Sequence, residues 1–149
     1  MNTMLSVSKD EVTGFVHDWF RKLDDHADVT DVVPMLSAST FYMKVPEAEI
    51  KSIAEFETWY QGVVCKFFDE QHTMKELTID LASNGTQADV KFCVNWETRA
   101  WSPPAARSKH IMLDAYQTWA VRRSSTSQRL VIASYVIDKV ELKQGSATL

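Results

Sequence analysis

The chain has 149 residues, of which 45% are hydrophobic and 24% charged, and its formal net charge is -4. This length and composition are typical of one globular domain and exclude a low-complexity or repeat protein. The negative charge disfavours nucleic acid or an anionic membrane as the main partner. The sequence also contains no apolar run of the roughly 18 residues that span a bilayer.

The cysteines and the N-terminal sequence bear on the cellular compartment. Cys65 and Cys93 are isolated and do not form a CxxC pair. The first nine residues lack the charged-then-apolar pattern of a secretory signal. We therefore expect reduced thiols and a cytoplasmic protein.

The N-terminal half shows two helix-period apolar stripes with one short strand between them. A capping box at 8–11 precedes an apolar stripe over 12–23, which predicts a first long helix. Residues 41–45 alternate in hydrophobicity and predict a lone strand that ends at Pro46. A second capping box, at 52–55, precedes a stripe over 56–67 and predicts a second long helix.

A polar cluster separates the first helix from a short second one. Its members are Asp24, Asp25, His26, Asp28 and Asp31. The cluster has neither the turn glycine nor the closing glutamate of a calcium loop. Acids near the start of the short helix are explained by its dipole, so we predict no metal site.

The C-terminal half shows four strand-period runs. The first two, over 76–81 and 89–97, alternate cleanly and flank Asn84-Gly85, a residue pair favoured in type I′ hairpin turns. The last two, over 111–121 and 130–137, are apolar on both faces. A strand with apolar side chains on both faces must be shielded from water on both faces, and the helices can shield only one of them. We therefore predict a homodimer packed through the outer face of the sheet.

The densest basic group also lies in this half. Arg122, Arg123 and Arg129 flank a serine-rich loop. A run of charge beside small polar residues is typical of a solvated hairpin tip, and we interpret it so.

Helices first and an antiparallel meander last predict an α+β domain whose sheet curls over its helices. In this order, and in the stretches 75–78, 88–98 and 111–116, the chain resembles the SnoaL-like, ketosteroid-isomerase-like branch of the nuclear-transport-factor-2-like superfamily. The resemblance implies one domain over 1–149, with a core over about 8–143 and a disordered tail over 144–149. It also implies a cystatin-like α+β roll, in which a curved antiparallel or mixed sheet wraps around three N-terminal helices. Such a cone encloses one deep apolar pocket for a small molecule and uses no cofactor.

Two residues would carry chemistry if the resemblance extends to the site. Asp114 resembles the strand carboxyl that ketosteroid isomerases keep protonated by burial, so that it donates a hydrogen bond to a developing oxyanion. A register shift of one residue would instead turn Asp114 to the outer face, toward an arginine. His72 precedes the first meander strand, where several related dehydratases and cyclases place a catalytic histidine. The alternative for His72 is an exposed position at the start of the strand, after the polar turn over 69–71.

The other pocket residues implied by the resemblance are aromatic or apolar. They are Trp19, Phe92, Val94, Trp96, Tyr116, Ala133, Tyr135 and Ile137.

One family feature is missing. Ketosteroid isomerases carry a general-base aspartate at the end of the lone strand, whereas Lys44 and Val45 precede Pro46 here. Three functions therefore stay open. The chain is an acid–base enzyme of the isomerase, cyclase or dehydratase type, a module that binds an apolar cyclic ligand unchanged, or a structural subunit like the small subunit of ring-hydroxylating dioxygenases.

Overall fold

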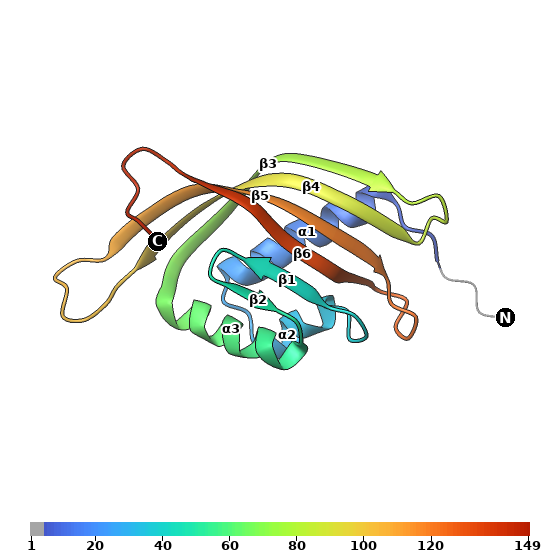
Figure 1. The fold of residues 1–149 in the computed structure, drawn as a ribbon, viewed down its shortest axis with the longest axis horizontal. Coiled ribbons are helices and arrows are strands. Elements are labelled where there is room, and N and C mark those ends of the chain that lie inside the picture. Colours follow the sequence, from blue (N-terminus) through green and yellow to red (C-terminus); the bar gives the residue numbers. More distant parts are fainter. Residues whose placement is uncertain (1–4) are drawn as a thin grey trace.

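A computed structural model describes residues 5–149 of the chain, and Figure 1 shows its fold. The elements in chain order are α1 (Lys9–Asp24), α2 (Val29–Val32), the 3₁₀ turn η1 (Val33–Met35), β1 (Tyr42–Val45), β2 (Ala48–Ile50), α3 (Ile53–Lys66), β3 (Phe67–Leu81), β4 (Gln87–Ala100), β5 (Lys109–Arg123) and β6 (Leu130–Leu142). The predicted α+β class is confirmed.

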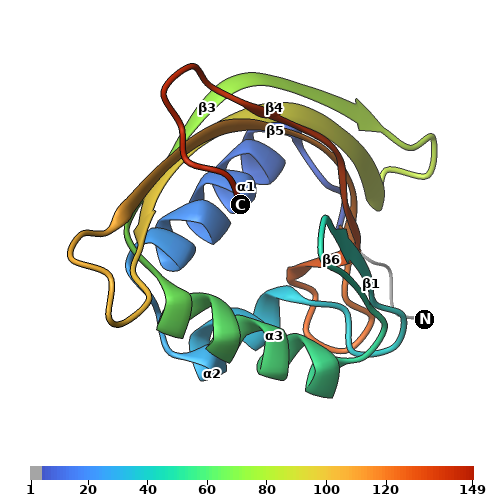
Figure 2. The same cartoon turned by 60° about the vertical axis from the view of Figure 1, so that its left-hand side comes forward.

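All six strands form one mixed sheet in the order β2-β1-β6-β5-β4-β3. β1 runs parallel to β6, and every other neighbouring pair is antiparallel. Figure 2 shows that the long strands curl around α1, while α3 lies across the open side of the curl. The sheet and helices thus form the expected cone.

The first helix forms and packs for the reasons that its sequence predicts. The Ser8 side chain accepts a hydrogen bond from the backbone N–H of Glu11, 3.1 Å away, and so caps the first turn. One stripe of the helix is buried in the core, namely Val12, Val16, Trp19, Phe20 and Leu23. Burying five such side chains contributes on the order of 10 kcal/mol before conformational entropy is subtracted.

Four β-bulges bend the long strands. They interrupt the β3–β4 ladder at 68–71 and 74–76, and the β5–β6 ladder at 116–117 and 120–121. At the first of them Asp69 adopts φ 52, in the left-handed region that a short polar side chain tolerates better than most. Each extra residue kinks its strand and increases the local twist, which lets the sheet close around α1.

Several local predictions are wrong in detail. β3 follows α3 directly, because the polar residues over 69–71 form a bulge within the strand and not a turn before it. Gly85 has φ 75, but Asn84 has no positive φ, so the β3–β4 loop is not a type I′ turn. The short strand β2, which pairs with β1, was not predicted. Its three residues are too few to show a period.

Residues 144–149 lie beside β5. The Ser146 hydroxyl accepts a hydrogen bond from the N–H of Met112, and the N–H of Ala147 donates to the carbonyl of His110. The tail is therefore held at the wide end of the cone. Over residues 5–149, no helix is both long and apolar enough to cross a membrane. The homodimer on the outer face stays a prediction.

Candidate functional site

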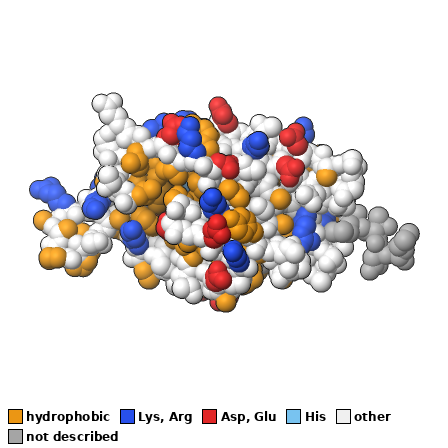
Figure 3. Space-filling view, viewed as in Figure 1, with side chains coloured by type: hydrophobic (Ala, Val, Ile, Leu, Met, Phe, Trp, Pro, Cys, Tyr) orange, Lys and Arg blue, Asp and Glu red, His pale blue; other side chains and the backbone are white. Residues whose placement is uncertain are grey.

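The concave side of the sheet encloses a cavity of about 120 Å³. Its walls come from the inner faces of β3, β4, β5 and β6, from the end of α1, from α3, and from the β1–β2 turn; they include Leu23, Val45, Val63, Phe67, Val94, Trp96, Leu113, Ala115, Ile137 and Val140. Figure 3 shows hydrophobic side chains gathered over the half of the molecule where Figure 1 draws the bent arm of β3, β6 and β1. An apolar cavity therefore lies at this end of the cone, where the sequence predicted a pocket for a small molecule.

A histidine on the wall of this cavity pairs with a carboxylate behind it. Nδ1 of His72 on β3 lies 2.5 Å from Oδ1 of Asp24, the last residue of α1. The backbone N–H of His72 donates to the other carboxylate oxygen of Asp24, at 3.1 Å. The imidazole is stacked against Phe20 at 4.7 Å and Trp96 at 6.0 Å, and only 9% of the side chain is exposed. The aromatic rings and the carboxylate together fix the orientation of the imidazole.

A second acid–histidine pair lies beside the first. Oε2 of Glu70 is 2.5 Å from Nε2 of His26, and its Oε1 accepts a hydrogen bond from the indole N–H of Trp96 at 3.1 Å. The Glu70 side chain is 3% exposed and contributes to the cavity wall. Because both of its oxygens are engaged, this carboxylate positions Trp96 and provides a fixed negative charge at the pocket.

The opposite wall carries two polar side chains from β5 and β6. Oε1 of Gln117 accepts a hydrogen bond from the indole N–H of Trp119 at 3.0 Å, which leaves the amide nitrogen of Gln117 available as a donor. Tyr135, which lines the same cavity, is 3% exposed. Burial raises the pKa of Tyr135 well above its ordinary value, so its hydroxyl keeps its proton and remains a donor.

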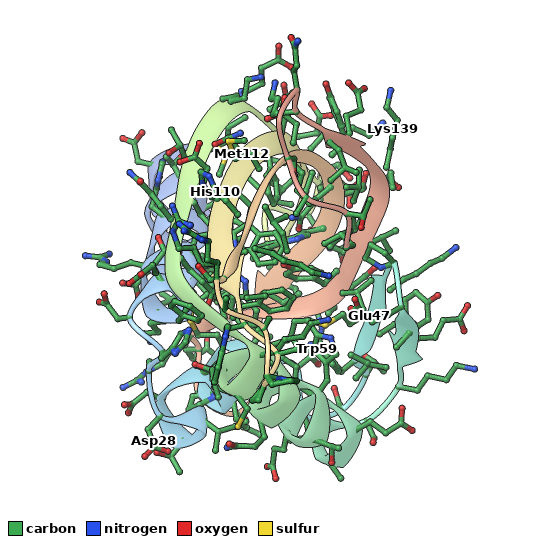
Figure 4. The ribbon with its side chains drawn as sticks, turned by 90° about the vertical axis from the view of Figure 1, so that its left-hand side faces the viewer. Asp28, Glu47, Trp59, His110, Met112 and Lys139 are labelled. Atoms are coloured by element: carbon green, nitrogen blue, oxygen red, sulfur yellow. The ribbon has the colours of Figure 1, made fainter. Side chains whose placement is uncertain are left out.

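Two features lie at the rim of the cavity: a hydrogen bond between two side chains on one side, and the C-terminal tail on the other. Figure 4 shows Glu47 and Trp59 close together at one side of the opening, where the indole N–H of Trp59 donates to Glu47 at 3.1 Å. His110 and Met112, which anchor the tail, lie on the other side. Leu149 reaches the cavity wall and is 58% exposed. The tail thus narrows the opening.

The structure places the predicted pocket residues in three different environments. Trp96, Tyr135 and Ile137 line the cavity, as does Val94. Trp19 and Phe92 lie deeper, in the core, where both pack on Trp119. Tyr116 was placed wrongly. Its neighbours Ala115 and Gln117 line the cavity, so Tyr116 points to the outer face, and its ring lies 5.0 Å from Nζ of Lys139. Ala133 falls at the β5–β6 bulge over 120–121 and does not line the cavity.

The prediction that Asp114 faces the pocket is also wrong. Its neighbours Leu113 and Ala115 line the cavity, so alternation turns Asp114 to the outer face. There it accepts hydrogen bonds from Lys75 at 2.8 Å and from Lys143, while Asn95 donates to its other oxygen. Burial opposes the charge of this carboxylate, but the two lysines and Asn95 outweigh that effect and lower its pKa to about 2. Asp114 is therefore ionised, and its partners are lysines and not an arginine.

The stability contribution of this ion pair should depend on pH. A folded-state pKa below the unfolded value stabilises the fold above pH about 4, and the effect is lost as the pH falls toward 2. Asp114→Asn should therefore lower the free energy of unfolding at pH 7. Because both lysines are partly exposed and screened, we expect at most about 2 kcal/mol.

Urea denaturation at pH 7, 4 and 2.5 checks this expectation, with Asp89→Asn as the control. Asp89 is exposed on β4 and makes no ion pair among the described residues. The control should change stability by less than about 0.5 kcal/mol. A loss for Asp114→Asn that stays the same at all three pH values would contradict the assignment.

Sequence reasoning found His72 but missed its partner. Asp24 was assigned to a helix end, although it lies four residues after Phe20 and so continues the apolar stripe of α1. A carboxylate that continues an apolar stripe could have marked Asp24 as a candidate site residue. His26 was predicted only as a member of the polar cluster after the first helix, and Glu70 as part of a turn. Nothing in their local sequence indicates that they meet.

The described residues bring together no group of three or more metal-binding side chains. Each of the pairs Asp24–His72 and Glu70–His26 could offer a metal ion only two ligand groups, and within each pair these two groups are hydrogen-bonded to each other.

The comparisons with known proteins show a similarity of fold only. No protein-family model and no curated protein sequence matches the chain. Among solved structures, a hexachlorocyclohexane dehydrochlorinase of type 2 (LinA) is similar with a TM-score of 0.73 and 8% identity, covering 95% of this chain and 92% of that one. A ketosteroid isomerase-like protein from Erwinia carotovora atroseptica has a TM-score of 0.65 and 14% identity, covering 85% and 92%.

A third structure is a protein of unknown function from Nostoc punctiforme with a cystatin-like fold. It has a TM-score of 0.69 and 12% identity, and covers 99% of this chain and 100% of its own. These similarities confirm the cystatin-like α+β fold expected from the sequence. At such low identity they carry no activity over to this chain.

Proposed function

We propose that the chain is a cofactor-independent enzyme that removes a proton from a small apolar ring compound, in an elimination or an isomerisation. The observation that carries the proposal is the pairing of His72 with Asp24 on the wall of an apolar cavity. His72 acts as the general base, and Asp24 as the residue that orients it.

The hydrogen-bond pattern supports these roles. If Nδ1 of His72 donates to Asp24, the Nε2 lone pair is the one left to accept a proton, and no described residue occupies it. Asp24 then stabilises the imidazolium that forms, as the carboxylate does in any base–orienter pair. The proton moves from a substrate carbon to Nε2, and the electron pair of the broken C–H bond forms a new double bond. In an elimination the neighbouring carbon releases its leaving group together with the bonding electrons. In an isomerisation the π electrons of the adjacent carbonyl move onto its oxygen, and the proton on Nε2 is later returned to another carbon.

The remaining polar groups suit the charge that this step creates. The Tyr135 hydroxyl and the Gln117 amide are donors on the wall that β5 and β6 supply. Either could stabilise negative charge on a substrate oxygen or on a departing group. Glu70 repels an anion, which favours a neutral substrate.

The size of the cavity favours a single ring. An engineered apolar cavity of roughly 150 Å³ binds benzene, and the cavity here is about 120 Å³. A fused four-ring skeleton would be too large while Leu149 holds its position. Two solved structures of this fold are named for a dehydrochlorinase and a ketosteroid isomerase, so the architecture is compatible with such chemistry.

Hydrogen–deuterium exchange tests the function across several classes of ring compound at once. Single-ring ketones, and ring compounds with a hydroxyl or halide next to an acidic C–H, are incubated with the protein in D₂O and followed by proton NMR. We expect loss of one C–H signal, through exchange or elimination, for at least one ring class. The rate should fall in Asp24→Asn but not in His110→Asn, a histidine outside the cavity wall.

The same panel separates catalysis from binding. A ligand raises the melting temperature by mass action whether or not it reacts. Compounds that stabilise the protein but are recovered with all C–H signals intact would favour the binding module over the enzyme.

A further inference from the structure

A second cavity, of about 540 Å³, lies at the other end of β5 and β6 from the apolar pocket. It is formed by the η1–β1 loop, the first residue of α3, and the β5–β6 hairpin. In Figure 3 a group of basic side chains lies in the region where Figure 1 draws this hairpin. This is the serine-rich loop that the sequence analysis interpreted as a solvated tip.

The polar side chains around this cavity are arginines and hydroxyl residues, without acids. Two arginines, Arg122 and Arg129, and six hydroxyl side chains line it; Ser37, Ser39, Ser124 and Ser127 are among the six. No aspartate or glutamate belongs to the wall, although the chain has 20 acidic residues. The cavity therefore offers positive charge and hydroxyl donors without a resident anion.

Arg122 is held in place by hydroxyls and not by an acid. Its Nη2 donates to Ser37 at 2.6 Å and to Ser39 at 2.7 Å, and Ser37 is 2% exposed. Within residues 5–149, the other guanidinium nitrogens of Arg122 make no hydrogen bond, and the side chain of Arg129 makes neither a hydrogen bond nor an ion pair. The neighbouring Arg123 shows the contrast, because its guanidinium is bonded to both oxygens of Glu11.

We propose that this cavity binds a phosphate monoester group, with Arg122 and Arg129 as its charged partners. Arg122 is positioned in advance by the buried Ser37, so less side-chain entropy is lost when an anion binds. One planar guanidinium group can donate two parallel hydrogen bonds to two oxygens of a phosphate, and serine and threonine hydroxyls can donate hydrogen bonds to the remaining oxygens. Ile53, the first residue of α3, also lines the cavity, so the N-terminus of that helix borders it.

A dianionic tetrahedral group fits this wall better than a carboxylate does. Two cationic side chains on one wall balance two negative charges, and several hydroxyls provide donors in more than one plane. The cavity is also larger than a bare phosphate ion, so the group would be carried by a small molecule. The site is separate from the apolar pocket and does not depend on the function proposed for it.

Arg129→Gln is the decisive variant. The Arg129 side chain has no partner within the described residues, so its loss should leave the fold intact. Arg122→Gln is a second variant, which also removes the contacts to Ser37 and Ser39. Arg107→Gln is the matched control, since Arg107 is an exposed arginine on the β4–β5 loop and its substitution changes the net charge equally.

Inorganic phosphate and glycerol phosphate are titrated into ¹⁵N-labelled protein and followed by amide chemical shifts, with sodium chloride at matched ionic strength as the reference. We expect shifts confined to the segments that line the cavity, 33–40, 53 and 122–131. The affinity should be about tenfold weaker in Arg129→Gln but unchanged in Arg107→Gln. Tighter binding of glycerol phosphate than of inorganic phosphate would assign the site to a phosphorylated small molecule; the reverse order would assign it to free phosphate.

Three results would overturn the proposal. Chloride at equal ionic strength reproducing the shifts would show general screening only. Equal weakening in Arg129→Gln and Arg107→Gln would show an effect of net charge. Shifts that map outside 33–40, 53 and 122–131 would place the anion elsewhere.

Discussion

His72→Asn should lower kcat/KM for proton removal by a factor of about 10²–10⁴, the usual contribution of a general base. Asparagine keeps a polar side chain of similar length near Asp24, but it has no basic nitrogen. Asp24→Asn should cause a smaller loss, because the imidazole remains while its orientation and the stabilisation of its cation are lost. The rates come from the deuterium-exchange assay with whichever ring class reacts.

An NMR measurement tests the same pair without any substrate. If Asp24 accepts a hydrogen bond from Nδ1, the neutral form of His72 carries its proton on Nδ1, and ¹⁵N shifts distinguish the two ring nitrogens. We expect this tautomer in the native protein and a mixture in Asp24→Asn. Full activity in His72→Asn would remove the histidine from the mechanism, whatever its tautomer.

Trp19→Ala should lower the free energy of unfolding by about 3–5 kcal/mol. Trp19 is completely buried, and its ring lies 5.7 Å from that of Tyr135, 6.0 Å from that of Trp119 and 6.1 Å from that of Phe56. It therefore joins α1 to α3 and to two strands of the sheet. A loss of this size is a large part of the roughly 5–15 kcal/mol that stabilises a domain.

Two further variants make the Trp19 prediction specific. Trp19→Phe should cost less than half as much as Trp19→Ala, because phenylalanine fills most of the space and removes an indole N–H that is buried without a partner among the described residues. Trp101→Ala, at a tryptophan that is 50% exposed on the β4–β5 loop, should cost less than about 1 kcal/mol. Urea denaturation gives all three values, and equal losses for Trp19→Ala and Trp101→Ala would contradict the packing described.

The fold could be predicted from the sequence to the extent that its elements are local. The stripe from Val12 to Leu23 needs only the helical period to identify its buried face, and Ser8 needs only its neighbour Glu11 to mark the start of the helix. The predicted long helices and strands are present for this reason. The bulges at 68–71 and 120–121 could not be predicted in the same way, because a bulge depends on the partner strand as well as on its own residues.

The site could be predicted only in part for a related reason. Trp96, Tyr135 and Ile137 line the pocket as expected, since the inner face of a curled sheet must be apolar. Asp114 and Tyr116 lie on a strand that is buried on both faces, so alternation gave two equivalent choices and the resemblance favoured the wrong one. Asp24 and His72 are 48 residues apart, and no local pattern connects them.

The class of fold follows from the order of the residues alone, because hydrophobic period is a property of neighbouring residues and the order of helix and strand periods limits how layers can pack. The same reasoning, with the family resemblance, placed His72 among the candidate residues. Three features could be seen only in the folded chain: the face of β5 that meets the cavity, the hydrogen bond between Asp24 and His72, and the cavity that Arg122 and Arg129 line without an acid. Each of these depends on how strands curl and pair over long distances, and that arrangement is set by the packing of the whole cone.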